Sequence, residues 1–381
     1  MFKLVNSIPV AFALILLLLA GNNNQSNAFW HDNSTDISEQ TYTSTPDLVE
    51  EVISTVIYIF MEKNPQAQGD QFGGLLPESP TPSMGVGTGF FINDQGYIVT
   101  NTHVVKDTKS ILIYYWDSPL EYNEAQVVGM DEVADIAVIK INPEGPTNYV
   151  EWGDSEQVRL GEDVVAIGHG MSMPWAVTKG VISMTYRQPD MSKPMILYNQ
   201  SDTVINQGNS GGPLFNMDGE VVGVNTLLYS RTGAFSGVGF SVPSNLAKRS
   251  VDQIISTAEF DDDGNVVKQG YVKYTAIGIK FSRIETLEER NKLKDLGIYS
   301  VIKVKETPQG GAANEAGILP DDIIISIDDK EIISSIDLVR HLWYTSVGDT
   351  VKIVVYRNNE YLTLDVTLKE FNFIPQVTKG K

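Results

Sequence analysis

Short apolar runs separated by turn residues dominate the middle of the chain. The tetrapeptides Asn93-Asp94-Gln95-Gly96 and Asn216-Met217-Asp218-Gly219 each lie between two such runs, a pattern typical of β-hairpins. With hardly a helical pattern between residues 85 and 225, the many short runs predict antiparallel β-barrels or sandwiches. The runs predicted as strands are residues 87–92, 97–101, 110–116, 125–129, 136–141, 163–167, 176–185, 195–199, 213–215 and 220–225.

A mixed pattern follows these strands. Residues 244–258 predict a helix with Ser244 as its N-cap, and an acidic stretch comes next. Residues 271–368 then combine strands with helical stretches near residues 308–316 and 335–345, which indicates an α+β unit of about 100 residues. The apolar positions expected on the buried side of the first helix are Leu246, Val251, Ile254 and Ile255.

The first 28 residues have the organisation of a secretory signal peptide. Lys3 precedes an uncharged apolar run, residues 8–20, and Ser26-Asn27-Ala28 fits a small-x-small cleavage site. As a helix the run would be about 20 Å long, shorter than a bilayer core of about 30 Å. We therefore expect export to the periplasm or cell envelope. If the segment stays uncleaved, it would instead anchor the protein in the inner membrane.

The amino-acid composition excludes several kinds of partner and active site. With 48 acidic and 28 basic residues, the formal net charge is −20, which disfavours nucleic acid as a partner. The absence of cysteine excludes disulfides, thiolate metal sites and a cysteine nucleophile, and we expect neither a metal nor another cofactor. Only four histidines are present, so a histidine-dependent reaction has few places to occur.

One glycine-rich turn carries a candidate nucleophile. In Gly208-Asn209-Ser210-Gly211-Gly212, glycines on both sides of Ser210 allow a tight turn that can aim backbone amides at one point. A serine hydroxyl needs such a site and a neighbouring base to become reactive. Taken alone, the pattern is also typical of an ordinary hairpin turn.

A histidine and an acid precede this serine. His103 is expected at the end of a strand, in Asn101-Thr102-His103-Val104-Val105, and Asp135 opens the apolar strand at 136–141. Singly, each is compatible with a structural role. The order His103, Asp135, Ser210 is that of chymotrypsin-type proteases, and the all-β context agrees with their fold. We therefore interpret these residues as a catalytic triad.

The surrounding segments resemble one protease family. GTGFFINDQGYIVTNTHVV, ADIAVIKI, QSDTVINQGNSGGPLF and GVGFSVPSN are similar to segments of the HtrA (Deg) serine proteases. Downstream, GGAANEAGILPDDIIISIDDKEI and VGDTVKIVVYRNNEYLTLDVTL resemble a PDZ domain. The resemblance covers about residues 46–370 and implies a mainly β protein, with a chymotrypsin-like double β-barrel followed by an α+β PDZ domain.

The patterns and the resemblance together divide the chain into six parts. These are a signal peptide or anchor (1–28), a flexible tether (29–45), a trypsin-like serine protease domain (46–258), an acidic linker (259–269), a PDZ domain (270–370) and a C-terminal tail (371–381).

The resemblance implies a role for each matching position. Ser210 would attack the peptide carbonyl, His103 would transfer the proton, and Asp135 would orient His103. The amides of Gly208 and Ser210, with Asn209 shaping the turn, would form the oxyanion hole. The specificity pocket would be formed by Val204, Ile205, Ser236, Gly237 and Val238. Because no acid is expected in that pocket, we predict cleavage after small or medium aliphatic residues.

Two segments depart from the family pattern. Where the family usually has Asn-Pro-Phe-Gly, this chain has His169-Gly170-Met171-Ser172, followed by Met173, Pro174 and Trp175. The difference indicates either drift of a loop or an altered substrate cleft, to which Met171, Met173 and Trp175 would add apolar surface. The PDZ carboxylate-binding loop, expected at Ala276, Ile277, Gly278 and Ile279, lacks the usual leading aromatic residue. We expect it to bind C-terminal peptides; the alternative is a purely regulatory or assembly domain.

The predicted function is that of an ATP-independent envelope endopeptidase. Its substrates would be unfolded proteins or specific regulatory proteins, with the PDZ domain recruiting them or regulating activity. The alternative is a chaperone or PDZ scaffold in which proteolysis is secondary. The resemblance also implies a homotrimer.

Overall fold

The computed structural model describes residues 44–63, 84–118, 120–169, 175–189, 195–206, 208–228, 236–284 and 286–371. The predicted signal segment, most of the tether and nearly all of the C-terminal tail lie outside these residues. So do Gly170 to Pro174 of the divergent loop.

The first half of the described chain forms a seven-stranded antiparallel sheet in the order β5-β4-β1-β2-β3-β7-β6. Its strands are rich in β-branched and aromatic residues, and their inward side chains form a core that includes Ile57, Ile59 and Phe91. The strands are β1 (Val56–Lys63), β2 (Met84–Phe91), β3 (Tyr97–Thr100), β4 (Thr108–Tyr114), β5 (Tyr122–Glu124), β6 (Gln126–Asp131) and β7 (Ile136–Lys140).

A second sheet closes into a barrel. Its order is β12-β9-β10-β11-β14-β13-β8, and β12 also pairs with β13, so six strands form a closed ring with β8 attached to β13. Closure leaves no unpaired edge in that ring. The strands are β8 (Glu151–Trp152), β9 (Asp163–Gly168), β10 (Ala176–Arg187), β11 (Tyr198–Ser201), β12 (Pro213–Phe215), β13 (Glu220–Leu228) and β14 (Gly239–Pro243). The two sheets confirm the mainly β prediction.

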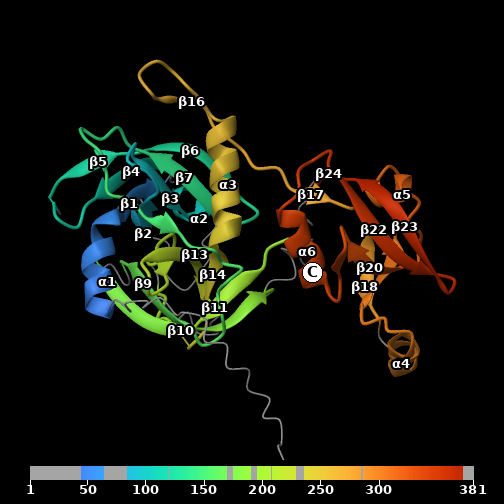
Figure 1. Cartoon of the computed structure of the whole chain (residues 1–381). Coiled ribbons are helices and arrows are strands. Elements are labelled where there is room, and N and C mark those ends of the chain that lie inside the picture. The colour runs from blue at the N-terminus through green and yellow to red at the C-terminus, as the bar shows by residue number, and fades with distance from the viewer. Residues whose placement is uncertain are drawn as a thin grey trace, which may run out of the picture. The chain divides into compact units, whose positions relative to one another are not determined.

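Two helices flank the sheets (Figure 1). Helix α1 (Thr45–Val52) begins with a capping box, in which Ser44 and Asp47 satisfy each other's backbone amides. Helix α3 (Ser244–Thr257) packs against β6, β7 and β13. The prediction of Ser244 as its N-cap was wrong, because Pro243 takes that position and the Ser244 hydroxyl donates to the Gly153 carbonyl at 2.6 Å.

The stretch predicted to be an acidic linker contains a small hairpin. Strands β15 (Glu259–Phe260) and β16 (Val266–Lys268) pair, and the Asp261 carboxylate accepts the amides of Asp263 and Asn265. An aspartate whose side chain bonds to amides two and four residues later stabilises a tight turn. The acidic residues therefore form part of a turn.

The C-terminal domain is built on a sheet in the order β18-β19-β20-β22-β23, in which β21 also pairs with β20. A third helix, α4 (Leu287–Asp295), was missed by the sequence prediction; only Leu293 of this helix is buried, so it lacks an apolar stripe. The other elements are β17 (Thr275–Ala276), β18 (Lys280–Arg283), β19 (Ile302–Glu306), α5 (Ala312–Glu315), β20 (Ile323–Ile327), β21 (Lys330–Glu331), α6 (Ser335–Trp343), β22 (Thr350–Arg357), β23 (Glu360–Thr367) and β24 (Lys369–Glu370). Within the described ranges, no helix is long and apolar enough to cross a bilayer.

Candidate active site

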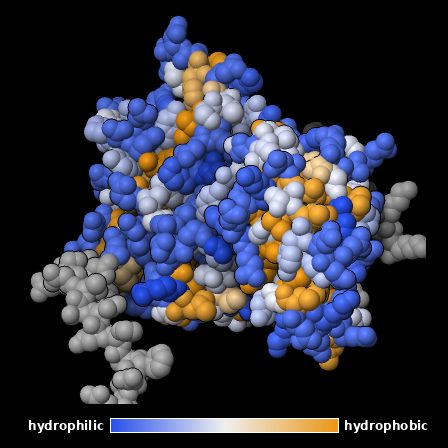
Figure 2. All heavy atoms as spheres, turned by 45° about the vertical axis from the view of Figure 1, so that its right-hand side comes forward, coloured by the Kyte–Doolittle hydropathy of each residue, from blue (hydrophilic) through white to orange (hydrophobic). Residues whose placement is uncertain are grey.

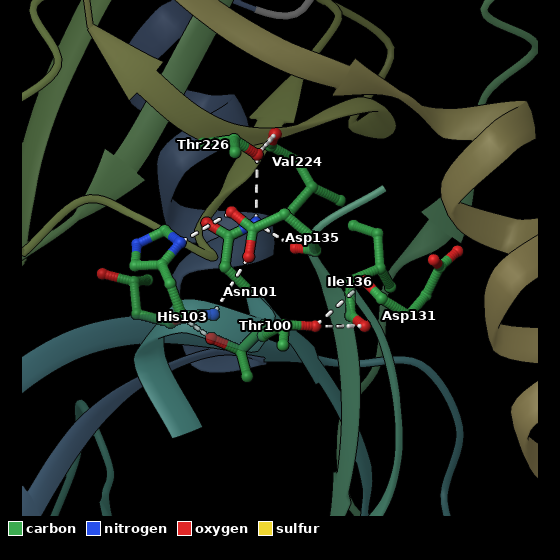
Figure 3. Close-up of polar contacts among 10 residues, drawn as sticks. Thr100, Asn101, His103, Asp131, Asp135, Ile136, Val224 and Thr226 are labelled. Carbon is green, nitrogen blue, oxygen red and sulfur yellow. Dashed lines mark hydrogen bonds and ion pairs between the residues drawn. The ribbon is translucent and has the colours of Figure 1, made fainter. Parts of the chain in front are cut away.

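His103 and Asp135 form a close pair (Figure 3). His103 Nδ1 lies 2.6 Å from Asp135 Oδ2, and the backbone amide of His103 donates to Asp135 Oδ1 at 2.9 Å. Because a carboxylate only accepts, Nδ1 carries the proton and Nε2 is left free to take one up. The expected strand end was inaccurate: His103 lies on α2 (Thr102–Val105), a single helical turn that follows β3.

The backbone of Asp135 is held in an uncommon conformation. Its φ is 60°, in the left-handed region that non-glycine residues seldom occupy. Its carbonyl accepts the Asn101 side-chain amide at 2.8 Å and the Thr102 backbone amide at 3.2 Å. Such a conformation persists only where the surroundings fix it, and it aims the carboxylate at His103.

A second aspartate, Asp131, supports the same turn and was not singled out in the sequence. Its Oδ1 accepts the amides of Val133 and Ala134, at 3.0 and 3.1 Å. Its Oδ2 accepts the hydroxyls of Ser250 and Tyr274, both at 2.6 Å. Burial raises the pKa of Asp131, while these four hydrogen bonds oppose the rise. The only signal in the sequence is an acid four residues before Asp135.

The loop that carries Ser210 has a defined set of occupied and free amides. The amides of Asn209, Gly211 and Gly212 donate to backbone carbonyls at 2.8–3.0 Å. Among the described residues, the amides of Gly208 and Ser210 have no acceptor. Gly211 has a φ of 83°, and a Cβ there would overlap Thr100 Oγ1 and Thr88 O. The glycines thus allow a compact turn beside the buried Ser210.

His103 follows β3 of the first sheet, whereas Ser210 lies in the loop before β12 of the second sheet. The two hydrogen bonds of His103 within the described chain both go to Asp135, and neither involves Ser210. Without substrate, the hydrogen bond between a catalytic serine and its histidine is commonly long, and it shortens when substrate is bound.

The residues predicted to line a specificity pocket lie on two neighbouring segments. Ile205 is buried, and its side chain reaches within 3.0 Å of the position a Cβ would take at Gly239. Val204 is 40% exposed. The Oδ1 of Asp202, two residues before Val204, accepts the Val181 amide of β10 at 2.7 Å. Ser236 and Gly237 are exposed and Val238 is half-buried, directly before β14.

In the C-terminal domain, the predicted carboxylate-binding loop joins β17 to β18. Ile277 is buried, and its carbonyl accepts the Ala313 amide at 2.7 Å. The amides of Ile277, Gly278 and Ile279 have no acceptor in the described part of the chain. Ala276, the first residue of this loop, ends β17.

Comparison with known proteins gives this arrangement a family. Residues 87–224 match the model of a trypsin-like peptidase domain, and residues 275–368 match that of a PDZ domain. The serine protease Do-like HtrA of Bacillus subtilis (strain 168) is 31% identical over 362 residues, covering 90% of this chain and 75% of that protein. The chain belongs to the HtrA family of serine proteases.

Other relatives and solved structures agree with HtrA membership. A probable periplasmic serine endoprotease, DegP-like, of Chlamydia muridarum (strain MoPn / Nigg) is 34% identical over 74% of this chain. That match covers 54% of the relative, so this HtrA chain spans about half the length of the DegP-like proteins it matches. The solved HtrA-type protease AlgW with tripeptide has a TM-score of 0.70 at 26% identity, covering 88% of this chain and 99% of that one.

His169, at which this HtrA chain departs from the usual family pattern, lies inside the protein. The imidazole is fully buried between the rings of Tyr58 and Trp175, with ring centroids 4.6 and 4.9 Å away. Burial lowers the pKa of His169 to about 3, so the ring is neutral near pH 7. Met171 and Met173, predicted to add apolar surface to a cleft, lie outside the described residues.

We predict that His169 makes the protein sensitive to acid. The unfolded chain protonates this histidine near pH 6.5 and the folded chain only near pH 3, so stability is lost as pH falls through that window. Between pH 7 and pH 5 the loss is about 2 kcal/mol relative to His169→Asn. Urea unfolding of both proteins, each also carrying Ser210→Ala against self-digestion, measures the difference. Parallel stability–pH curves would contradict the prediction.

Proposed function

We propose that the protein is a serine endopeptidase with His103, Asp135 and Ser210 as its triad. The observation that carries the proposal is the His103–Asp135 pair together with the Ser210 loop: among the described residues, His103 Nε2 has no hydrogen-bond partner and the amides of Gly208 and Ser210 have no acceptor. Membership of the HtrA family and the names of its relatives support the same reaction.

The proposed reaction follows from these groups. Ser210 Oγ attacks the scissile carbonyl while His103 Nε2 takes the hydroxyl proton, forming the new C–O bond. Asp135 keeps the ring oriented and stabilises its charged form. When the C–N bond breaks, His103 returns the proton to the leaving amine. Water then attacks the acyl-enzyme by the same proton transfers and releases the acid.

The amides of Gly208 and Ser210 would bind the oxyanion of the tetrahedral intermediate. Both are free of other acceptors in the described chain, whereas the amides around them are occupied. A fixed donor aimed at developing charge lowers the barrier by about 3–4 kcal/mol. Asn209 would act by shaping the turn.

Replacing Ser210 by Ala tests the nucleophile. We expect Ser210→Ala to lose peptide-bond cleavage by at least about 10³-fold, because no other group can form the acyl-enzyme. Casein digestion and labelling by a fluorophosphonate probe measure activity, and circular dichroism with thermal unfolding serves as the control for folding. Cleavage retained by a folded, purified Ser210→Ala protein would contradict the assignment.

The proposed specificity pocket consists of Val204, Ile205, Ser236, Gly237 and Val238. None of these residues is an acid that could pair with a basic side chain of the substrate. Ile205 gives it a buried apolar base, and Asp202 is bonded to β10. These features support a preference for aliphatic residues.

We predict that a cleavage-site map shows Val, Ile and Ala before the cut bond. Mass spectrometry of a denatured protein digested to low extent would provide the map. Val204→Asp is the matched variant, since a carboxylate at this position would attract Lys and Arg and shift the map toward them. A wild-type map dominated by Lys and Arg would be inconsistent with the pocket.

The PDZ domain is proposed to bind C-terminal peptides at the loop Ala276 to Ile279. Free successive amides suit a carboxylate, and β18 lies at the edge of its sheet, where a peptide can add as a strand. Exposed apolar side chains interrupt the hydrophilic surface of this domain (Figure 2). Phe281 on β18 is 41% exposed.

A peptide with a free C-terminus should therefore bind more tightly than its amidated form. We expect at least a tenfold difference in Kd, because amidation removes the charge that the loop amides would bind. Fluorescence anisotropy with the full-length Ser210→Ala protein and a dye-labelled apolar peptide measures it. Equal affinity of the two peptides would favour a PDZ domain with only a regulatory or assembly role.

Cell location, substrates and assembly complete the proposal. The signal segment at residues 1–28 would direct the protein to the periplasm or cell envelope, and relatives carry the description periplasmic. Unfolded or specific regulatory proteins would be its substrates, and a homotrimer its assembly. The division into protease domain (46–258), linker (259–269) and PDZ domain (270–370) stays a prediction in its boundaries.

A further inference from the structure

We propose that Thr88 and His169 together form a support that positions the oxyanion loop. This inference rests on the proposed function, since it concerns the loop of Gly208 to Ser210. The two residues are positioning residues, because they act through the backbone of that loop.

Thr88 contacts the loop at two points. It lies on β2, is completely buried, and its backbone amide donates to the Ser210 carbonyl at 3.0 Å. Its hydroxyl donates to the Gly208 carbonyl at 2.6 Å. The carbonyls of the two residues on either side of Asn209, Gly208 and Ser210, therefore both accept hydrogen bonds from one residue of the other sheet.

The hydrogen bonds assign a direction to the contact with His169. The Thr88 hydroxyl has one hydrogen, and the Gly208 carbonyl can only accept it. His169 Nδ1, 2.9 Å from Thr88 Oγ1, must then be the donor. The assigned chain runs from His169 Nδ1–H to the Thr88 hydroxyl and on to the Gly208 carbonyl. A hydroxyl that accepts one bond becomes a stronger donor in the next.

His169 is itself held in place. Its ring packs between Tyr58 and Trp175, which restricts its rotation. Its Nε2 is buried and has no partner among the described residues, so Nδ1 makes the hydrogen bond of the ring in this part of the chain. Gly168, just before it, also contacts the loop: a Cβ there would lie 2.8 Å from Asn209 Oδ1 and 3.1 Å from Asn209 Cα.

Gly208 explains why the loop needs such a support. Its φ is 105°, a conformation reached easily only by glycine, and glycine also rotates easily away from it. The amide of Gly208 keeps its direction only if the residue is fixed from outside. The bond to the Gly208 carbonyl fixes the peptide that follows Gly208, and the bond to the Ser210 carbonyl fixes the peptide that follows Ser210. The two proposed oxyanion donors lie on the peptides directly before these, so fixing both residues restrains the directions of both donors.

A set of variants tests the support by kinetics. Thr88→Val keeps the shape and removes the hydroxyl, Thr88→Ser keeps the hydroxyl, and His169→Phe keeps a ring without a donor. We expect Thr88→Val to lower kcat about 10- to 100-fold with KM changed less than about threefold. His169→Phe should lower kcat less, and Thr88→Ser should restore most of it.

The double variant and a remote control separate positioning from general damage. Because His169 acts through Thr88, adding His169→Phe to Thr88→Val should cause little further loss of kcat. Thr55→Val removes another buried hydroxyl, one that donates to the Val52 carbonyl at 2.6 Å, and should leave kcat unchanged. Additive losses in the double variant, or an unchanged kcat in Thr88→Val, would overturn the proposal.

A readout that does not depend on hydrolysis completes the test. Hydrogen exchange followed by mass spectrometry should show faster exchange of the segment containing Gly208 to Gly212 in Thr88→Val and His169→Phe, but not in Thr88→Ser or Thr55→Val. If the wild-type protein hydrolyses no peptide and exchange still responds, the proposed function fails and the support stands. If hydrolysis is normal and exchange does not respond, the support fails alone.

Discussion

The buried side chain of Asn101 joins the two sheets at the point where the candidate site forms. Its amide donates to the carbonyl of Asp135 at 2.8 Å and to the hydroxyl of Thr226, on β13 of the second sheet, at 3.0 Å (Figure 3). Without this amide the Asp135 carbonyl would keep only the Thr102 amide, and the buried Thr226 hydroxyl would lose its donor, at a cost of about 1–3 kcal/mol for a buried unpaired group. This amide joins the two sheets together with the two bonds from Thr88 to the Ser210 loop, and it is the one that contacts the left-handed Asp135, whose carboxylate holds His103.

Much of this fold could be predicted from local pattern, and the exceptions have physical causes. Residues close together in the sequence determine the hairpin turns at Asn93–Gly96 and Asn216–Gly219 and the short strands around them. Helix α2 is too short to leave a periodic pattern, and α4 is mostly exposed, so neither has an apolar stripe to detect. Ser244 has the residue type of a cap, but its hydroxyl is bonded to a carbonyl distant in sequence.

In the candidate site, too, some residues could be predicted from the sequence and others could not. His103, Asp135 and Ser210 could be selected because residue type and chain order carry information about chemistry. The residues that hold them in place could not be selected in this way. Asp131 reaches Tyr274 across 143 positions, and Thr88 reaches Gly208 across 120, so only the folded chain brings the partners together. The sequence marked His169 as a departure from the family, but it did not show that the ring would be buried against Thr88, Tyr58 and Trp175.

The group behind Asp135 and the groups behind the Ser210 loop differ in their electrostatics. Asp131 accepts four hydrogen bonds behind the turn that holds Asp135, which fixes that turn and ties it to Ser250 of α3 and to Tyr274. Behind the Ser210 loop, a neutral imidazole and a hydroxyl do the corresponding work. Since a carboxylate beside the loop would oppose the negative charge of an oxyanion, neutral donors suit that side better. The burial that keeps His169 neutral also favours its protonation on unfolding, so the same contact that orients the loop makes the fold less stable in acid.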